Sequence, residues 1–182
     1  GLMVEASPIN YEKLVQNRKN EIALVHAGVC SKEQDLHWVD MVGEGRRAVS
    51  GFLEFAADSF KERWWSEKAI KNAQVVRCRR MENVVSETVG KHHHFDFFSL
   101  DVEGAEYEVL SSIDFKKVSF GVVFVEADEH NHEKNNKVKQ ILEENGYEFI
   151  YNKRRSDFFR HCDFDEIYKD IIPSMKANIT EK

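Results

Sequence analysis

Residues Phe95 to Leu110 read Phe-Asp-Phe-Phe-Ser-Leu-Asp-Val-Glu-Gly-Ala-Glu-Tyr-Glu-Val-Leu, and the pattern changes at Asp101. The six residues before Asp101 form a nearly continuous, aromatic-rich apolar run, which predicts a strand that is buried on both faces. After Asp101, Gly104 permits a tight turn, and apolar residues recur at helical spacing up to Leu110. The stretch therefore predicts a strand-to-helix junction of an open α/β sheet.

Carboxylates crowd the start of the predicted helix. Ligands of open α/β sheets bind in the crevice outside the carboxyl ends of the strands, so we expect Asp101 and Glu103 at the mouth of a pocket. Asp101 directly follows the apolar strand and is expected to be partly desolvated, a cost that is more often tolerated where a group binds something. Glu106 and Glu108 fall in the first helical turn, where solvated charges that complement the helix dipole are the simpler interpretation.

Two segments of the chain, taken in order, resemble one known family. The run Phe98–Glu106, followed by Val109-Leu110, closely resembles the signature of the FkbM-type methyltransferase domain. The segment Leu2–Pro8, with Leu14 and Asn17–Asn20 behind it, resembles the second strand and the following helix of the same family. The resemblance implies a class I fold that binds S-adenosylmethionine and methylates an oxygen.

The resemblance covers roughly residues 1–163 and is weak between Asp40 and Val75. Many family members have a lysine where this chain has Ser99, so no role of that lysine can be transferred. The first strand of the family and its glycine-rich loop are expected to precede Gly1, and we therefore expect the chain to be N-terminally truncated.

The candidate cofactor residues follow two early strands. Glu5 comes directly after the apolar residues Leu2–Val4, at the position where Rossmann-type folds place an acid for ribose hydroxyls, although a surface glutamate is the alternative. In the next apolar run, Ala27-Gly28 is small enough to let a flat ring approach the backbone. The resemblance implies that Glu5 and Ala6 lie at the ribose, that Ala27, Gly28 and Val29 border the adenine, and that Asp101 completes the cofactor site.

The resemblance implies a Rossmann-like, class I methyltransferase fold. We expect a three-layer α/β sandwich with a mostly parallel sheet and a C-terminal antiparallel hairpin made by Tyr147–Tyr151 and Asp157–His161. Residues 1–165 are expected to form one methyltransferase domain, and residues 166–182 a C-terminal helix and tail.

The composition sets limits on fold and partners. A chain of 182 residues with 42% hydrophobic and 32% charged residues predicts one globular domain with a real core. A net charge of −6 gives no general attraction to nucleic acid or to an anionic membrane. No apolar stretch approaches the ~20 residues that span a bilayer.

The cysteines and the basic clusters give no sharp prediction of a site. Cys30, Cys78 and Cys162 are odd in number and far apart, so neither a disulfide framework nor a zinc site is indicated, and a reducing compartment such as the cytoplasm is compatible. The clusters Arg77–Arg80 and Lys153–Arg155 are solvated strand ends in the simpler interpretation and anion contacts in the alternative.

Three other segments have both a structural and a functional interpretation. Ser7-Pro8 predicts the start of a helix. Phe52–Ile70 predicts an amphipathic helix or a lid, in which Trp64-Trp65 packs in the core or lines a substrate entrance. The consecutive histidines His92–His94 point in divergent directions, so we predict no metal site there.

An acidic cluster follows the predicted strand Val118–Val125. Its members have the ligand types of a divalent cation, but an acidic loop over the pocket is the simpler interpretation, and no metal is predicted. Glu126 or His130 could then serve as a general base. The cluster comprises Glu126, Asp128, Glu129, His130, His132 and Glu133.

The sequence thus predicts an S-adenosylmethionine-dependent methyltransferase that acts on a hydroxyl of a small molecule or glycan. Its catalytic candidates are Asp101, Glu103 and Glu126. A catalytically inactive relative that serves as a binding module is the alternative, and an enzyme that uses NAD or a nucleotide sugar is a third, less well supported interpretation.

Overall fold

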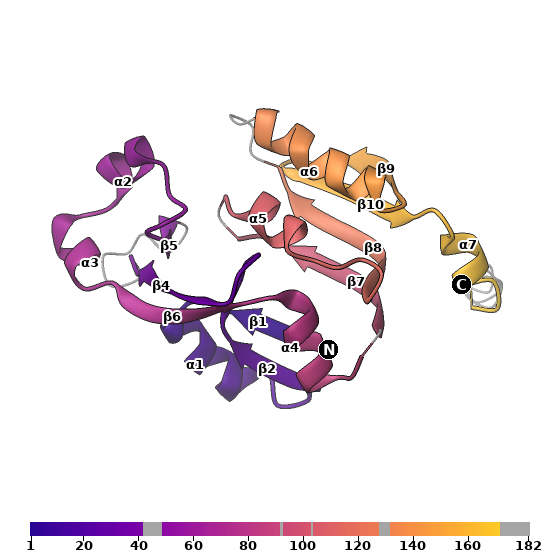
Figure 1. Cartoon of the computed structure of the whole chain (residues 1–182), viewed down its shortest axis with the longest axis horizontal. Coiled ribbons are helices and arrows are strands. Elements are labelled where there is room, and N and C mark those ends of the chain that lie inside the picture. Colours follow the sequence, from indigo (N-terminus) through magenta and orange to yellow (C-terminus); the bar gives the residue numbers. More distant parts are fainter. Residues whose placement is uncertain (42–48, 92, 103, 128–131, 172–182) are drawn as a thin grey trace, which may run out of the picture. The chain divides into compact units, whose positions relative to one another are not determined.

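The computed structural model describes residues 1–41, 49–91, 93–102, 104–127 and 132–171. They form two compact units (Figure 1). The first unit contains Gly1–His93 and Asp101–Val118, and the second contains His94–Leu100 and the chain from Ser119 onward. Each unit is described by itself below.

The first unit begins with the predicted strand, helix and strand. Strand β1 (Leu2–Glu5) pairs in parallel with β2 (Ala23–His26), so that Glu5 lies opposite His26. Helix α1 (Pro8–Asn17) connects the two strands, and its start was predicted correctly, because the Ser7 Oγ caps it by accepting a hydrogen bond from the Asn10 N–H at 3.3 Å.

A second sheet of the same unit is mixed, which corrects the prediction of a mostly parallel sheet. Its order is β3 (Gly28–Val29), β6 (Gln74–Arg79), β4 (Gln34–Val39) and β5 (Gly51–Phe52). Strand β6 pairs in parallel with β3 but antiparallel with β4, and β4 is antiparallel with β5. The connection from β3 to β4 is too short for the crossover of a dozen or more residues that parallel strands need, so β4 runs antiparallel to β3 on the other side of β6.

The segment Phe52–Ile70 forms two short helices and not one amphipathic helix. Helix α2 (Asp58–Trp64) is followed by Trp65, whose backbone is extended. Helix α3 (Glu67–Lys71) then begins, and the Ser66 side chain caps it. Trp65 is only 6% exposed and packs with Val39, Met41 and Ala69, and its indole N–H donates to the Val49 carbonyl. The core interpretation is therefore confirmed for Trp65, while Trp64 is partly buried beside the Arg63 guanidinium, 4.9 Å from the ring centre.

Cys30 and Cys78 form a disulfide, which the sequence did not predict. Both residues are fully buried, with a Cα–Cα distance of 5.7 Å, and they belong to a small core with Leu36, Phe52 and Val76. The pairing of β3 with β6 brings the two cysteines together across a separation of 48 residues, a distance in sequence at which spacing alone gives no signal.

Replacing Cys78 by serine is expected to lower the free energy of unfolding by about 2–4 kcal/mol, because the disulfide restricts the unfolded chain. Denaturant unfolding would measure the change, with Cys162→Ser as the control, since Cys162 is free and exposed. Titration of the folded parent should find one free thiol. Three titratable thiols, or equal stability of the two variants, would contradict the prediction.

Two helices complete the first unit. Helix α4 (Met81–Thr88) follows β6 directly, and its Val84 and Val85 side chains are buried. Helix α5 (Glu106–Ser111) contains the end of the family-like signature and buries Val109 and Leu110. Helix α5 was predicted from its periodicity.

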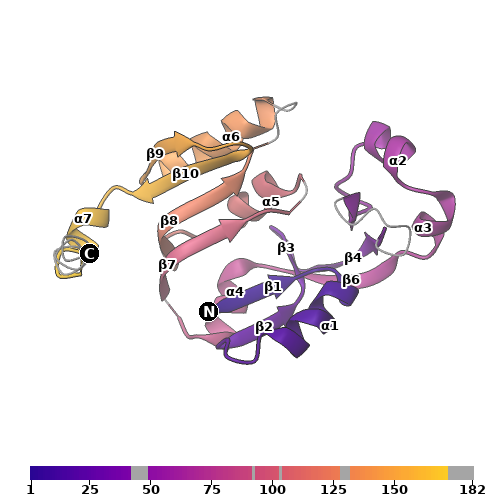
Figure 2. The same cartoon turned by 180° about the vertical axis from the view of Figure 1, so that it is seen from behind.

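The second unit is a four-stranded sheet with a helix on one face. The strand order is β7 (His93–Leu100), β8 (Val118–Glu126), β10 (Ser156–His161) and β9 (Tyr147–Asn152). Strand β10 is antiparallel to both β8 and β9, so the predicted C-terminal hairpin is confirmed. Helix α6 (His132–Glu144) lies in front of the sheet in Figure 1 and behind it in Figure 2, and it buries Val138 and Leu142.

Strand β7 differs from its prediction. Phe95 and Phe98 stack on Phe120 of β8, with ring centres 6.0 and 4.4 Å apart, but Phe97 is 55% exposed. The prediction that this strand is buried on both faces was therefore wrong.

The described part of the second unit also contains the short helix α7 (Phe164–Ile167). None of the helices in the described part of the chain is long and apolar enough to cross a membrane.

Candidate functional site

Glu5 ends β1 with its carboxylate held by its own backbone turn. The Ser7 N–H donates to Glu5 Oε1 at 2.8 Å, and the Ser7 hydroxyl donates to Asp40 at 3.2 Å. The Ala27 N–H donates to the Glu5 carbonyl at 3.1 Å, so the backbone after β2 is tied directly to the end of β1. Three predicted cofactor residues, Glu5, Ala6 and Ala27, are thus brought together.

Burial raises the pKa of Glu5 above its ordinary value. The backbone N–H groups of Ser7 and Ala6 and the nearby His26 act in the opposite direction, and the negative charge of Asp40 adds to the rise. His26 is itself fixed, because its ring stacks on Tyr11 with centres 4.9 Å apart. Glu5 is therefore a partly desolvated, oriented acceptor, as expected of an acid that binds a ligand.

The space beside Gly28, which was predicted for a flat ligand ring, is filled by a side chain of the protein. A Cβ at Gly28 would lie 2.6 Å from the Phe52 ring and 3.0 Å from the Cys78 sulfur. The flat ring that approaches this backbone is thus a side chain of the core, and packing explains why the residue is glycine. Ala27 is also buried, whereas Val29 is partly buried.

The two acids beside the turn after β7, Asp101 and Glu106, have the opposite burial to the one that the sequence predicted. Asp101 is exposed, so its expected desolvation was wrong. Glu106 is 0% exposed, so its expected solvation was wrong as well. The Glu106 Oε1 accepts hydrogen bonds from the Gly104 N–H at 3.1 Å and the Val102 N–H at 3.3 Å. Gly104 supplies the positive φ of 105° that the turn requires.

Helix α5 has Ala105 at its N-cap and no side-chain cap. Glu106 does not replace this cap, because the N–H groups that it accepts, those of Val102 and Gly104, precede the helix. The sequence therefore held no local signal for the role of Glu106. Glu103 lies outside the described residues.

Glu126 belongs to the second unit, whereas Glu5 and Asp101 belong to the first. It forms an ion pair with Arg155 at 3.0 Å across the β8–β10 pair, and the Ala127 N–H donates to the Arg155 carbonyl at 2.8 Å. Asp128, Glu129 and His130 of the acidic cluster lie outside the described residues. Within α6, Lys137 pairs with Glu133 at 2.7 Å and lowers the pKa of that carboxyl group.

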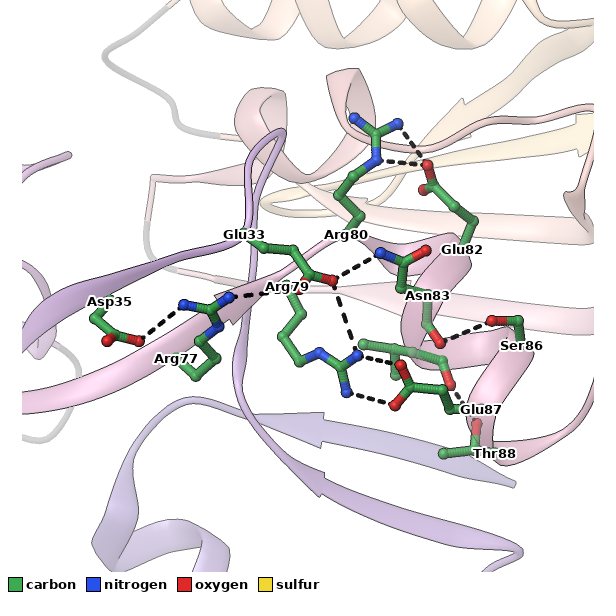
Figure 3. A network of polar contacts seen from close by, with 11 residues as sticks. Glu33, Asp35, Arg77, Arg79, Arg80, Glu82, Asn83, Ser86, Glu87 and Thr88 are labelled. Atoms are coloured by element: carbon green, nitrogen blue, oxygen red, sulfur yellow. Dashed lines mark hydrogen bonds and ion pairs between the residues drawn. The ribbon is translucent and has the colours of Figure 1, made fainter.

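The arginines of β6 lie in a network of carboxylates (Figure 3). Arg79 forms a two-armed ion pair with Glu87, and Arg77 contacts Asp35 at 3.3 Å and Glu33 at 3.5 Å. The pairing with Arg79 lowers the pKa of Glu87, and a hydrogen bond from Asn83 is the main cause that lowers the pKa of Glu33. This pairing favours the structural interpretation of the cluster over anion binding.

Two clusters of the second unit were not predicted. His94 contacts the Ser119 hydroxyl at 2.8 Å and the Tyr168 hydroxyl at 3.0 Å. His161, Cys162 and Asp163 place ligand-type atoms within 4.8 Å of one another, but the His161 ring already accepts the Asp163 N–H at 3.1 Å.

Comparison with protein families identifies the family of the chain. The model described as "Methyltransferase FkbM domain" matches residues 1–149, which is more than half of the chain. The comparisons with curated proteins and with solved structures gave no match.

Proposed function

The chain belongs to the family of methyltransferase FkbM domains, and from this premise we propose that it transfers a methyl group from S-adenosylmethionine to a hydroxyl oxygen of a small molecule or glycan. The choice of cofactor rests on the burial and the hydrogen bonding of Glu5. A partly buried carboxylate at the end of a parallel strand, held by a backbone N–H, suits the two neighbouring hydroxyls of a ribose.

The residues present fit this cofactor at the ribose. Glu5 uses Oε1 for the Ser7 N–H at 2.8 Å, and an ionised carboxylate has acceptor sites left for further donors. The Ala27 N–H fixes the neighbouring backbone by its bond to the Glu5 carbonyl. In the proposed site Glu5 and Ala6 lie at the ribose, and the turn of Ala27, Gly28 and Val29 borders the adenine, although Phe52 and not the adenine fills the space beside the Gly28 Cα.

The chain has little covalent chemistry to do in this reaction. When bound, S-adenosylmethionine supplies a methyl group already activated on a sulfonium. The protein must align the acceptor hydroxyl and, where the acceptor is weakly acidic, accept its proton. Asp101, Glu103 and Glu126 are the carboxylates proposed to accept this proton. Asp101 is favoured over Glu126, whose carboxylate is already engaged in an ion pair with Arg155 at 3.0 Å.

Replacing Glu5 by glutamine is expected to weaken binding of S-adenosylmethionine at least about tenfold, because a hydrogen bond to a charged acceptor is worth roughly 1.5–3 kcal/mol. Glutamine keeps the shape and the acceptor for Ser7 but removes the charge. Isothermal titration calorimetry measures the affinity. Glu12→Gln, an exposed change on α1 with the same loss of charge, is the matched control.

Three results of this titration would be informative. Weaker binding by the Glu5 variant alone supports the proposed site. Equal affinity of both variants and the parent removes Glu5 from the site. A parent protein that binds no S-adenosylmethionine contradicts the proposed function and favours an inactive relative that serves as a binding module.

A further inference from the structure

Strand β9 forms an edge of the sheet of the second unit, and the centre of this strand is apolar. Within the described part of the chain, β9 pairs with β10 alone, so its other side is open. Phe149, Ile150 and Tyr151 follow one another along it and are 40%, 45% and 45% exposed. Edge strands are usually protected from pairing by a charge or a proline, and the centre of β9 has neither. The edge is therefore open to a further strand.

The exposed aromatic rings of β9 lie on both faces of the sheet. The Phe149 ring contacts Phe159 with centres 5.6 Å apart, and the Lys139 ammonium of α6 lies 5.2 Å from its centre. The Tyr151 ring stacks on Phe158, with centres 4.6 Å apart. Phe158 and Phe159 are consecutive in β10 and point to opposite faces, and the register shift between them places Phe149 and Tyr151 on opposite faces as well. A strand added at this edge would thus meet an apolar ring on either face.

The two ends of β9 carry opposite charges. Glu148, near its start, pairs with Arg160 but is still 51% exposed. Lys153 and Arg154, just past its end, are exposed and form no ion pair with any described residue. When two identical strands pair antiparallel, the acidic end of each lies beside the basic end of the other, whereas parallel pairing would bring like charges together. The charges of β9 are therefore complementary to those of an antiparallel second copy.

We propose that β9 pairs antiparallel with β9 of a second copy of this chain, about a two-fold axis near Ile150. The pairing joins the two four-stranded sheets into one continuous sheet, and each copy covers the exposed apolar side chains of the other. Glu148 of each copy then lies beside the basic turn of the other. A two-fold contact is self-complementary and closed, so the assembly stops at a dimer.

The first test measures the mass of the full chain by size-exclusion chromatography with light scattering. At about 100 µM, well above the micromolar dissociation constants of weak interfaces, the parent should have twice the 21.3 kDa mass of one chain. Ile150→Lys brings two lysines together at the axis and should leave a monomer at the same concentration. Ile167→Lys is the matched control, because Ile167 on α7 is 43% exposed against 45% for Ile150, and it should remain a dimer.

A second measurement avoids the charged substitution. Cys162 is the free cysteine of the chain, and Cys30 and Cys78 are held in their disulfide, so Cys162→Ser gives a background suited to cross-linking. Ile150→Cys in this background places one thiol of each copy beside the two-fold axis. Mild oxidation should then give a disulfide-linked dimer on a denaturing gel, while Ile167→Cys in the same background should stay a monomer.

The two measurements together decide the proposal. A monomer in Ile150→Lys and a cross-link through Ile150→Cys support it, and circular dichroism checks that each variant is folded. A parent that is monomeric throughout overturns the proposal, and so does a parent that forms larger, open assemblies. A dimer that persists in folded Ile150→Lys without a cross-link through Ile150→Cys overturns it too, because the contact then lies elsewhere. If Ile150→Lys does not fold, the presence or absence of the cross-link decides alone.

Discussion

Glu106→Leu is expected to lower the free energy of unfolding by about 2–5 kcal/mol, because a buried carboxylate is lost and two backbone N–H groups of the preceding turn lose their acceptor. Glu106 is completely buried, and its carboxylate accepts from Val102 and Gly104. Leucine fills a similar volume but offers no oxygen. Chemical denaturation followed by circular dichroism would measure the change.

The controls for this prediction separate charge from hydrogen bonding. Glu106→Gln keeps one acceptor oxygen and should cost clearly less than leucine. Glu108→Leu, two residues further along α5, should change stability by no more than about 0.5 kcal/mol, as is usual for positions without such a role. If Glu106→Leu were as stable as Glu108→Leu, the carboxylate would not be what holds the turn.

The mistaken prediction for Glu106 shows a limit of local reasoning. Both Glu106 and Glu108 lie in the first turn of a helix, where acids are favoured by the helix dipole. The helix dipole favours a negative charge at both residues, so it does not determine which of the two side chains turns back toward the preceding loop. That choice follows from Gly104, whose positive φ directs the turn N–H groups to one acceptor.

Features that depend on neighbouring residues were predicted well. The strand-to-helix junction around Asp101, the helix start at Ser7-Pro8 and the C-terminal hairpin are all present. Each has a signal within a few residues: a change of period, a capping side chain followed by proline, or two apolar runs joined by a polar turn.

Features that depend on contacts between distant segments were missed. The Cys30–Cys78 disulfide and the antiparallel pairing of β4 with β6 both join segments about forty or more residues apart, and neither has a local signature. The break between α2 and α3 was missed for a related reason. Trp65 leaves the helix to bury its ring against Met41, and tertiary packing overrides the helical pattern.

The candidate site was predicted in part. Glu5 lies where its position after a strand indicated, and Ala27 is bonded to its backbone. Gly28 was selected for the right property, its small size, but Phe52 uses that space.

The structure removes one alternative role for Asp101. An aspartate just before a helix can cap it, and asparagine would cap about as well. Helix α5, however, begins at Glu106 with no side-chain cap, and the N–H groups of Val102 and Gly104 are taken by Glu106. Asp101 is exposed and makes no side-chain hydrogen bond or ion pair within the described residues. A stabilising role therefore has no support, and a role in methyl transfer is the proposal that remains.

Asp101→Asn is accordingly expected to lower the rate of methyl transfer by about 100-fold, the usual size of a general acid–base contribution, with little change in the thermal midpoint. Asparagine keeps the shape and the hydrogen-bonding capacity but cannot accept a proton. The rate would be measured at saturating S-adenosylmethionine, with methyl-labelled cofactor and a panel of hydroxylated small molecules and glycans. Asp58→Asn, an exposed change on α2, should retain the parental rate. An Asp101→Asn protein that methylates as fast as the parent, or that unfolds readily, would show that this carboxylate does not serve the reaction.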